Sequence, residues 1–379
     1  MFRSGVSAEG DGVGHVKVIT LLEAVRALLD SGEDVNQDIA GKKPIHIASA
    51  NGHVELIRAL LERGANVNQA TEDGVTALHI ASENGHVEAV IALLDGGAEV
   101  NQAKTNSATS LHIASESGHV EVVGALLDRG AEVNQAMEDG ATPLHIASEN
   151  GHVEVVRALL DGDKGANVNQ AKTNGATSLF VASENGHVEA VIALLDRGAE
   201  VNQAKTNGAT SLHVASRDGH VEVVRALLDR GANFNQAMED GITPLHIASE
   251  SGNIAVVGAL LDRGVDINQT MRDGATPLFI ASENGHEGAV IALLERGANV
   301  HQAMGDGATP LFIASENGHE EVVRVLNDHI AAVGAGVSVA TSDGGGGVGA
   351  VTGGENLEAT IGAVSGAYVE NAQEQAKVL

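Results

Sequence analysis

The chain of 379 residues contains no cysteine, no tryptophan, one tyrosine and five phenylalanines. Without cysteine it forms neither disulfides nor thiolate zinc sites, and the shortage of aromatic rings leaves few platforms on which bases or sugars stack. It also lacks a run of about 18 apolar residues, so we expect no membrane-spanning helix. Because Met1–His15 lacks the apolar stretch of a secretory signal, we expect a cytoplasmic protein, with the nucleus as the alternative.

Basic residues are scarce as well. The chain has 22 Lys and Arg against 51 Asp and Glu, which gives a formal net charge of −29. Nucleic acids and anionic membranes require a basic surface, so we expect neither of them as a partner. An acidic surface attracts basic groups and accelerates their association. We therefore expect a protein partner that is basic or neutral.

What the chain has in abundance is one segment that recurs about every 33 residues. The copy that begins at Gly74 reads GVTALHIASENGHVEAVIALLDGGAEVNQAKTN. Self-similarity at this period is typical of stacked repeats, in which each unit buries its apolar face against its neighbours. Nine copies begin at Gly41, Gly74, Ser107, Gly140, Gly175, Gly208, Gly241, Gly274 and Gly307.

These copies divide the chain into three parts. Residues 1–40 hold a partial, capping repeat, because Ile19–Gln37 matches only the second half of the unit. Residues 41–330 hold the nine repeats, and the fourth carries two extra residues in its last turn, which we expect to divide the array into blocks of unequal stability. Residues 331–379 are a glycine-rich tail that we expect to be flexible, with one short helical segment at Leu357–Tyr368.

Each repeat is expected to form two short helices and a turn. In the fourth repeat Thr142 fits an N-cap, Pro143 fits the first helical position, and Gly151 ends the helix. Apolar residues from Val153 to Leu160 then recur at the spacing of one helical face. The stretch ANVNQAKTNG that follows is rich in turn formers, so we expect an extended, hairpin-like connector.

The motifs of this unit resemble those of ankyrin repeats. The family pattern G-x-T-P-L-H-x-A, then G-H-x-x-V-V-x-x-L-L, then G-A-x-V-N, appears nearly verbatim over Gly140–Asn169 and Gly241–Asn268. The resemblance implies an all-α ankyrin-repeat solenoid with projecting hairpin-like turns and a concave face that binds proteins, without catalytic activity of its own. Three repeats depart from the pattern at the motif histidine, where the chain has Phe180, Phe279 and Phe312.

The 17 histidines recur with the repeat, and we expect them to be structural. One set lies three residues after the capping position, which is the spacing of a capping box with imidazole in place of the usual carboxylate. It comprises His46, His79, His112, His145, His213 and His246. The other set follows the glycine between the two helices. A zinc site requires converging ligands, so we expect no metal and no cofactor. The recurring HIAS motif is interpreted as packing, so we expect no enzyme.

Two sets of side chains are the candidate partner-binding residues. The first set lies at the turn tips, which we expect to be exposed and adaptable: Met137, Met238, Met271, Met304, Lys104, Lys172 and Lys205. The second set is an acidic row beside the tips, broken by one arginine: Glu83, Glu116, Glu149, Glu184, Arg217, Glu250, Glu283 and Glu316. The alternatives are a solvated helix face for the acidic row, and methionines that pack on neighbouring tips.

Some features recur every third repeat. The tip sequence KTN enters repeats three and six, MED enters repeats four and seven, and AVIALL recurs in the second helix. This pattern indicates duplication of a three-repeat block. It reflects either ancestry alone or a binding patch that occurs more than once.

The sequence therefore predicts a monomeric, non-enzymatic scaffold or adaptor that holds a protein partner on a preorganised concave surface. One alternative is a regulatory subunit that recruits a substrate for an enzyme on another chain. Another is a metal- or ligand-binding protein that uses the rows of histidines. Because a fold does not name a partner, its identity stays open.

Overall fold

The computed structural model describes residues 22–162 and 165–334, which form helices and turns. Residues 22–31 are helical. The first helices of the nine repeats are α2 (Pro44–Ala50), α4 (Ala77–Glu83), α6 (Ser110–Ser117), α8 (Pro143–Glu149), α10 (Ser178–Glu184), α12 (Ser211–Arg217), α14 (Pro244–Glu250), α16 (Pro277–Glu283) and α18 (Pro310–Glu316). The second helices are α3 (Val54–Glu62), α5 (Val87–Asp95), α7 (Val120–Asp128), α9 (Val153–Leu160), α11 (Val188–Asp196), α13 (Val221–Asp229), α15 (Ile254–Leu261), α17 (Glu287–Glu295) and α19 (Glu320–Gly334). Across these ranges no strand is formed, so the predicted all-α class is confirmed.

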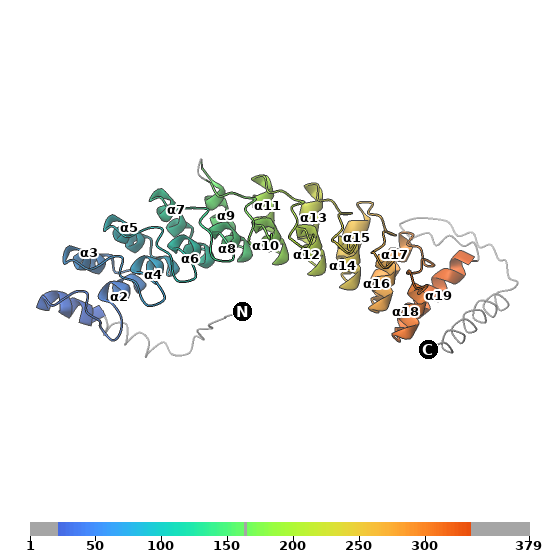
Figure 1. Cartoon of the computed structure of the whole chain (residues 1–379), viewed down its shortest axis with the longest axis horizontal. Helices are drawn as coiled ribbons and strands as arrows, with labels where there is room; N and C mark the ends of the chain where they lie inside the picture. Colours follow the sequence, from blue (N-terminus) through green and yellow to red (C-terminus); the bar gives the residue numbers. More distant parts are fainter. Residues whose placement is uncertain (1–21, 163–164, 335–379) are drawn as a thin grey trace, which may run out of the picture. The chain divides into compact units, whose positions relative to one another are not determined.

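Equivalent helices of successive repeats lie side by side (Figure 1). The first helices α4, α6 and α8 line one side of the stack, and the second helices α5, α7 and α9 line the opposite side. The described repeats follow an arc with the first helices on its inner side. We call the side formed by the first helices and the turn tips the inner face.

Small residues allow the repeats to approach closely. Ala147 and Ser148 of α8 are fully buried, as is Leu144 on the same helix. Val156 and Leu159 of α9 are also fully buried and extend one core that runs through all the described repeats. Burying a side chain the size of Leu or Val contributes about 1.5–3 kcal/mol, so each repeat is stabilised by contact with its neighbours.

The predicted capping boxes are confirmed at His79, His112, His145, His213 and His246, but not at His46, where Lys43 stands at the N-cap and makes no side-chain cap bond. In α8 the N-cap residue Thr142 has an extended backbone. Its side chain accepts a hydrogen bond from the backbone amide of His145, and the side chain of His145 accepts one from the backbone amide of Thr142. The amide of Thr142 donates to Nδ1 of His145 at 3.2 Å, so Nδ1 carries no proton. The other ring nitrogen, Nε2, therefore donates to the carbonyl of Ala176 in the next repeat at 3.2 Å. His112, His213 and His246 make the same link between their own helix start and the following repeat, whereas Nε2 of His79 is buried without a hydrogen-bond partner.

These capping histidines are neutral in the folded protein. Burial is the main cause that lowers the pKa of His145 to about 4. Burial lowers the pKa of His79, His213 and His246 to about 4 as well. A protonated ring would lose the hydrogen bond that Nδ1 accepts, so the cap requires the neutral form.

The second set of histidines joins each repeat to the preceding one. Nε2 of His152 donates to the carbonyl of Glu116 at 2.9 Å, and its ring packs on Gly118. A Cβ at Gly118 would lie 2.7 Å from Nδ1 of His152, so only glycine fits. Equivalent bonds are made by His86, His119, His187, His220, His286 and His319. Both sets are therefore connectors between repeats, as the structural interpretation predicted.

The insertion in the fourth repeat leaves these connections in place. Oδ1 of Asn134 accepts from the amide of Asn167 at 2.7 Å, and the carbonyl of Glu149 accepts from His187 at 3.0 Å. The insertion changes the end of α9, which stops at Leu160 with Asp161 extended. The predicted blocks of unequal stability concern unfolding, so they stay a prediction.

The ninth repeat differs from the others at its free side. Helix α19 continues to Gly334, so the expected tail boundary at residue 331 lies inside a helix. Phe312 is 44 % exposed, whereas its equivalent Phe279 in repeat eight is 4 % exposed, because repeat nine is the last of the described repeats and Phe279 is covered by the repeat after it. The expected helical segment in the tail lies outside the described residues.

Candidate partner-binding surface

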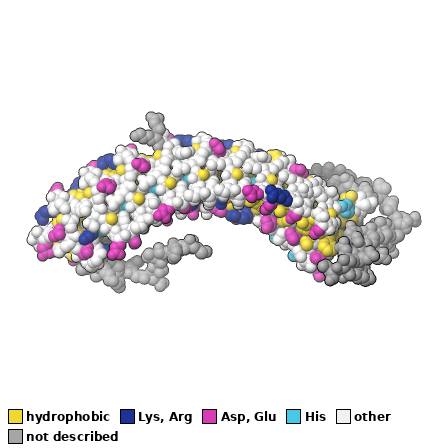
Figure 2. Space-filling view, viewed as in Figure 1, with side chains coloured by type: hydrophobic (Ala, Val, Ile, Leu, Met, Phe, Trp, Pro, Cys, Tyr) yellow, Lys and Arg dark blue, Asp and Glu magenta, His cyan; other side chains and the backbone are white. Residues whose placement is uncertain are grey.

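The acidic row lies on the inner face. Glu83 and Glu149 end their helices, Glu116 is one residue from the end of its helix, and all three are exposed. Figure 2 shows acidic side chains along this edge of the molecule. Glu184 and Glu283 are half-buried, and the remaining members Arg217, Glu250 and Glu316 are exposed.

The connectors form tight turns rather than strands. The amide of Lys104 donates to the carbonyl of Ala108, and the amide of Ser107 donates to the carbonyl of Lys104, both at 2.9 Å. Adjacent tips are bonded too, because the amide of Thr105 donates to the carbonyl of Asp73 at 3.1 Å. The expected extended hairpins are thus reduced to turns with isolated bridges, such as the one between Ala103 and Thr109.

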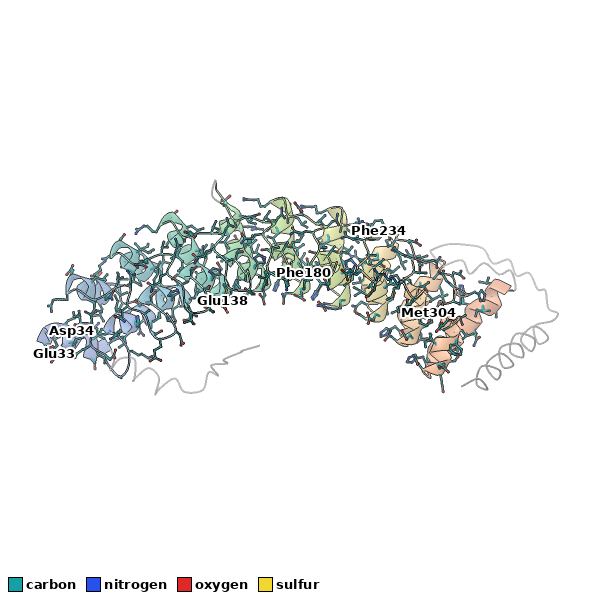
Figure 3. The ribbon with its side chains drawn as sticks, viewed as in Figure 1. Glu33, Asp34, Glu138, Phe180, Phe234 and Met304 are labelled. Carbon is teal, nitrogen blue, oxygen red and sulfur yellow. The ribbon has the colours of Figure 1, made fainter. Side chains whose placement is uncertain are left out.

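The expectation that the tip methionines are exposed was wrong. Met137, Met238, Met271 and Met304 are all half-buried. The tip lysines Lys104, Lys172 and Lys205 are also half-buried. Figure 3 labels Met304 and Phe180 on the inner side of the arc. Met137 lines a groove with Ile113 and Ile146 of the first helices, and Met238 packs against the cluster around Phe180.

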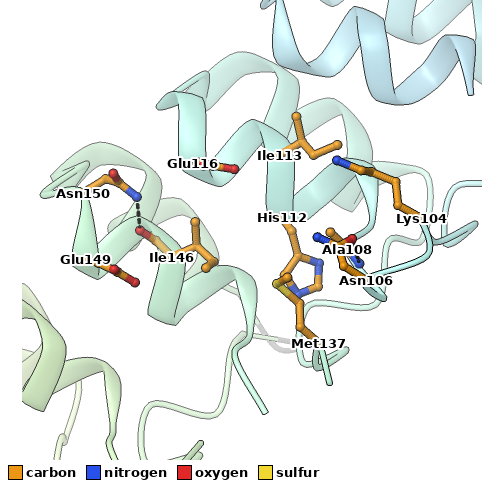
Figure 4. A pocket seen from close by; sticks show the side chains of 10 residues that line it. All are labelled: Lys104, Asn106, Ala108, His112, Ile113, Glu116, Met137, Ile146, Glu149 and Asn150. Carbon is orange, nitrogen blue, oxygen red and sulfur yellow. Dashed lines mark hydrogen bonds between the residues drawn. The ribbon is translucent and has the colours of Figure 1, made fainter. Parts of the chain in front are cut away.

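One groove of about 330 Å³ brings members of both candidate sets together. Ile113 on α6 and Ile146 on α8 form its apolar floor, and Glu116 and Glu149 lie one helical turn further along the same helices. Figure 4 shows these residues with Met137 and Lys104 at the turns. We call this site the open groove; its six defining residues are Lys104, Ile113, Glu116, Met137, Ile146 and Glu149.

A second groove of about 230 Å³ extends the open groove toward α4. It shares Lys104, Ile113 and Glu116 with the first and adds Glu83 at its far end. Among the described residues no ion pair involves Glu83, Glu116 or Glu149. The surface of repeats two to four therefore combines apolar side chains with three carboxylates that lack cationic partners.

Three repeats further along the chain, the surface equivalent to this groove is covered by side chains of the protein itself. Phe180 stands where repeat two has His79, and it packs in a small cluster with Val181, Val214 and Met238. The ammonium of Lys205 lies 4.6 Å from the centre of the Phe180 ring. Such a cation over an aromatic face is attracted by about 0.5–1 kcal/mol or more. The tip residues Lys205 and Met238 therefore both contact the cluster around Phe180.

Arginine neutralises the acidic row at the same place. Arg217 replaces the glutamate at this position and binds Glu184 at 3.2 Å and Asp218 at 2.9 Å. The hydrogen bonds that Arg217 donates to Asp218, and next the one that it donates to Glu184, raise the pKa of Arg217 above its ordinary value. At another tip, Lys172 binds Asp139 at 2.8 Å and lowers the pKa of that carboxyl. In repeats five and six the members of the acidic row, Glu184 and Arg217, are thus paired with each other.

The HIAS serines have no catalytic geometry. All of them are buried, and Oγ of Ser115 donates to the carbonyl of Leu111 at 2.7 Å. The hydroxyls of Ser49, Ser82, Ser148 and Ser249 have no hydrogen-bond partner among the described residues, so none of these serines is bonded to an imidazole. The part of the chain that the structure describes also contains no group of three or more His, Asp or Glu residues arranged to hold a metal ion.

Sequence reasoning identified the tips and the acidic row but missed the floor of the groove. Ile113 and Ile146 follow the motif histidine, at positions that the sequence analysis did not single out. The closure by Phe180 was also missed, although the replacement of histidine by phenylalanine was the available signal. Only the structure shows that this ring reaches the tips of the two following repeats.

The stacked helix pairs and the grooved inner face define a repeat-based protein-interaction domain. A model of the family described as ankyrin repeats (3 copies) matches residues 16–104, 68–137, 111–205, 201–271 and 263–335. The chain therefore belongs to the ankyrin repeat family, as the motifs predicted, and this family indicates protein–protein interaction.

Comparison with solved structures agrees. The crystal structure of the human ASB11 ankyrin repeat domain is 35% identical and has a TM-score of 0.53. The match covers 59% of this chain and 98% of that domain. No curated protein matches the sequence. Because 549 chains of solved structures match, the fold does not single out one partner. Of the helices described, none is long and apolar enough to cross a membrane.

Proposed function

We propose that the protein is a non-enzymatic scaffold or adaptor that holds a basic or neutral protein partner on its inner face. The observation that supports this most strongly is the open groove, in which Ile113 and Ile146 lie beside the carboxylates of Glu116 and Glu149. A rigid stack orders few side chains on binding, so little conformational entropy is lost. The net charge of −29 favours encounter with basic partners.

Affinity capture tests this proposal. The full chain and a variant would each be incubated with extract of the source organism. In the variant, six glutamates of the acidic row are changed to glutamine: Glu83, Glu116, Glu149, Glu250, Glu283 and Glu316. We expect proteins that the full chain retains and the variant releases. Equal retention by both chains, with equal thermal stability, would contradict binding through the inner face.

We also propose that the protein is a monomer and that it is located in the cytoplasm, with the nucleus as the alternative. Light scattering measures the mass of the purified chain against 38.6 kDa, and cell fractionation locates it. A stable dimer would contradict the first of these expectations.

A further inference from the structure

Two stretches of the inner face have almost the same sequence but different surfaces. The open groove carries Lys104 and Met137 at its tips, and three repeats later Lys205 and Met238 occupy the same positions. Their apolar floors also correspond, with Val214 in place of Ile113. We call the second stretch, in repeats six and seven, the closed copy. A duplicated block thus offers a comparison within one molecule.

In the closed copy the tip residues and Arg217 are paired with other side chains of the protein, and Glu250 is the one carboxylate of the three equivalent positions that has no ion pair among the described residues. Met238 packs on the Phe180 cluster, and Lys205 lies over the ring. Arg217 is bound to Glu184 and Asp218. A ligand there would have to displace these contacts first, which would reduce its net affinity.

The open groove has the opposite character. Glu116 stands where the closed copy has Arg217, and neither Glu116 nor Glu83 forms an ion pair among the described residues. With Glu149, three exposed carboxylates face one ammonium, that of Lys104. Beside them the groove is lined by Ile146, which is half-buried, and by Ile113, of which 9% is exposed. The complementary ligand is cationic, with an apolar side chain between its charges.

The spacing of the carboxylates defines the shape of that ligand. Glu83, Glu116 and Glu149 lie on the neighbouring first helices α4, α6 and α8, and packed helices are about 8–10 Å apart. A polyproline II segment rises about 3.1 Å per residue with three residues per turn, so every third side chain returns to the same side after about 9 Å. A β-strand would direct residues three apart to opposite sides.

We propose that the open groove, extended to Glu83, binds a polyproline II segment of the partner in which Lys or Arg occurs at every third position and an aliphatic residue lies between two of them. This inference rests on the proposed function and assigns it to repeats two to four. The closed copy is a relic of the duplication and does not bind the segment, so the array is monovalent for it.

Titration of the full chain with a synthetic peptide tests this inference. The peptide carries Lys at every third position with Leu between, and the control peptide has the same composition with Lys at every second position. Exposed ion pairs contribute about 0.2–1 kcal/mol each, so we expect three pairs to separate the two peptides by roughly tenfold in Kd at low salt. Equal affinities would refute the spacing argument.

A pair of matched variants locates the site. Glu116→Arg gives repeat three the residue of the closed copy, and we expect it to weaken peptide binding by about tenfold or more, because it removes one attraction and adds a repulsion. Glu250→Arg makes the same charge change in repeat seven, and we expect less than a twofold effect. Lys104→Gln removes the only cation of the groove and should tighten binding.

The outcomes distinguish this inference from the proposed function. If the peptide does not bind, or if the two arginine variants weaken binding equally, the inference is overturned, because only general acidity is then involved. Capture of a protein partner through the inner face could still succeed in that case. Circular dichroism of each variant excludes loss of folding as the cause.

Discussion

At the scale of single residues, the contact between a glycine and the histidine of the next repeat can be measured separately from backbone strain. Gly118 and Gly130 both have positive φ, 78° and 86°. A Cβ on Gly118 would collide with His152, whereas a Cβ on Gly130 meets nothing within 4 Å.

We therefore expect Gly118→Ala to destabilise the protein more than Gly130→Ala. The left-handed backbone costs each alanine about 1–2 kcal/mol, and the collision adds to this cost only in Gly118→Ala. Urea denaturation of both variants measures the difference in free energy of unfolding. If both lose the same stability, His152 can shift without cost, and the packing argument fails.

The buried histidines make stability dependent on pH. The pKa of His145 is about 4 in the folded protein and near its ordinary value of 6.5 in the unfolded chain. As pH falls, the unfolded chain takes up the proton first, so stability is complete above pH 6.5 and is lost between pH 6.5 and 4. One pKa unit corresponds to about 1.4 kcal/mol, so this group contributes up to roughly 3 kcal/mol.

The variant His145→Phe isolates this effect, since phenylalanine is tolerated at the same position in Phe279. Lys172 and Asp139, the charged groups that face the ring, remain in both proteins. We expect the wild type to lose more stability than the variant between pH 7 and pH 4.5, measured by denaturant unfolding. Parallel pH profiles would contradict a neutral, buried His145.

At the residue scale, the sequence best predicted those contacts in which both residues belong to the same helix start. The bond between Thr142 and His145 follows from their spacing of three residues. The contacts of Met238 could not be predicted from the sequence, because its partner Phe180 lies two repeats earlier in the chain. Sequence spacing does not determine how far a flexible side chain folds back.

At the scale of elements, α9 has a weaker end than its neighbours. In α7 the amides of Gly130 and Ala131 both bond to carbonyls of the last turn, each at 3.0 Å. In α9 the equivalent amide of Ala166 bonds to Leu159 at 2.7 Å, but that of Gly165 bonds to Gly162 at 3.2 Å instead of to the helix, and the amide of Asp161 makes a long bond of 3.4 Å to Ala158.

We therefore expect faster hydrogen exchange in the last turn of α9 than in the last turns of α7 and α11. Local opening is easiest where backbone hydrogen bonds are few or long. Exchange followed by mass spectrometry resolves these segments, and α11 is the internal control. Even protection through α9 would also remove the basis for blocks of unequal stability on either side of the insertion.

Helices and their order were predictable because caps, apolar periodicity and glycine stops agree in every repeat. The connectors were predicted less well. Their residues favour turns, but whether a turn continues as a hairpin depends on bonds between neighbouring tips, such as that from Thr173 to Asp139 at 2.9 Å. These bonds exist only in the assembled stack.

At the scale of the whole molecule, the net charge of −29 is a source of repulsion. Self-repulsion destabilises a compact state, and salt screens it over a distance of about 10 Å at 0.1 M. We expect the melting temperature to rise by several degrees when NaCl increases from about 10 mM to 150 mM. A fall would indicate that ion pairs such as Arg197–Asp161 outweigh the repulsion.

The described repeats bury their core among themselves, up to Val322 and Leu326 in the last of them. Removal of residues 335–379 is therefore expected to leave the thermal stability of the repeats nearly unchanged, measured by circular dichroism. The cut follows Gly334 because α19 extends that far. A large loss of stability would contradict this expectation.

The two rows of histidines have one more consequence, which concerns how such a chain lengthens. His112 reaches forward to the carbonyl of Ala141, and His119 reaches back to that of Glu83, and the same pair of links recurs along the stack. Junctions that carry both histidines are therefore chemically interchangeable with one another. A gene segment that encodes three repeats can be copied in one recombination event without a new interface having to evolve, after which substitutions such as His→Phe and Glu→Arg give one copy a separate history.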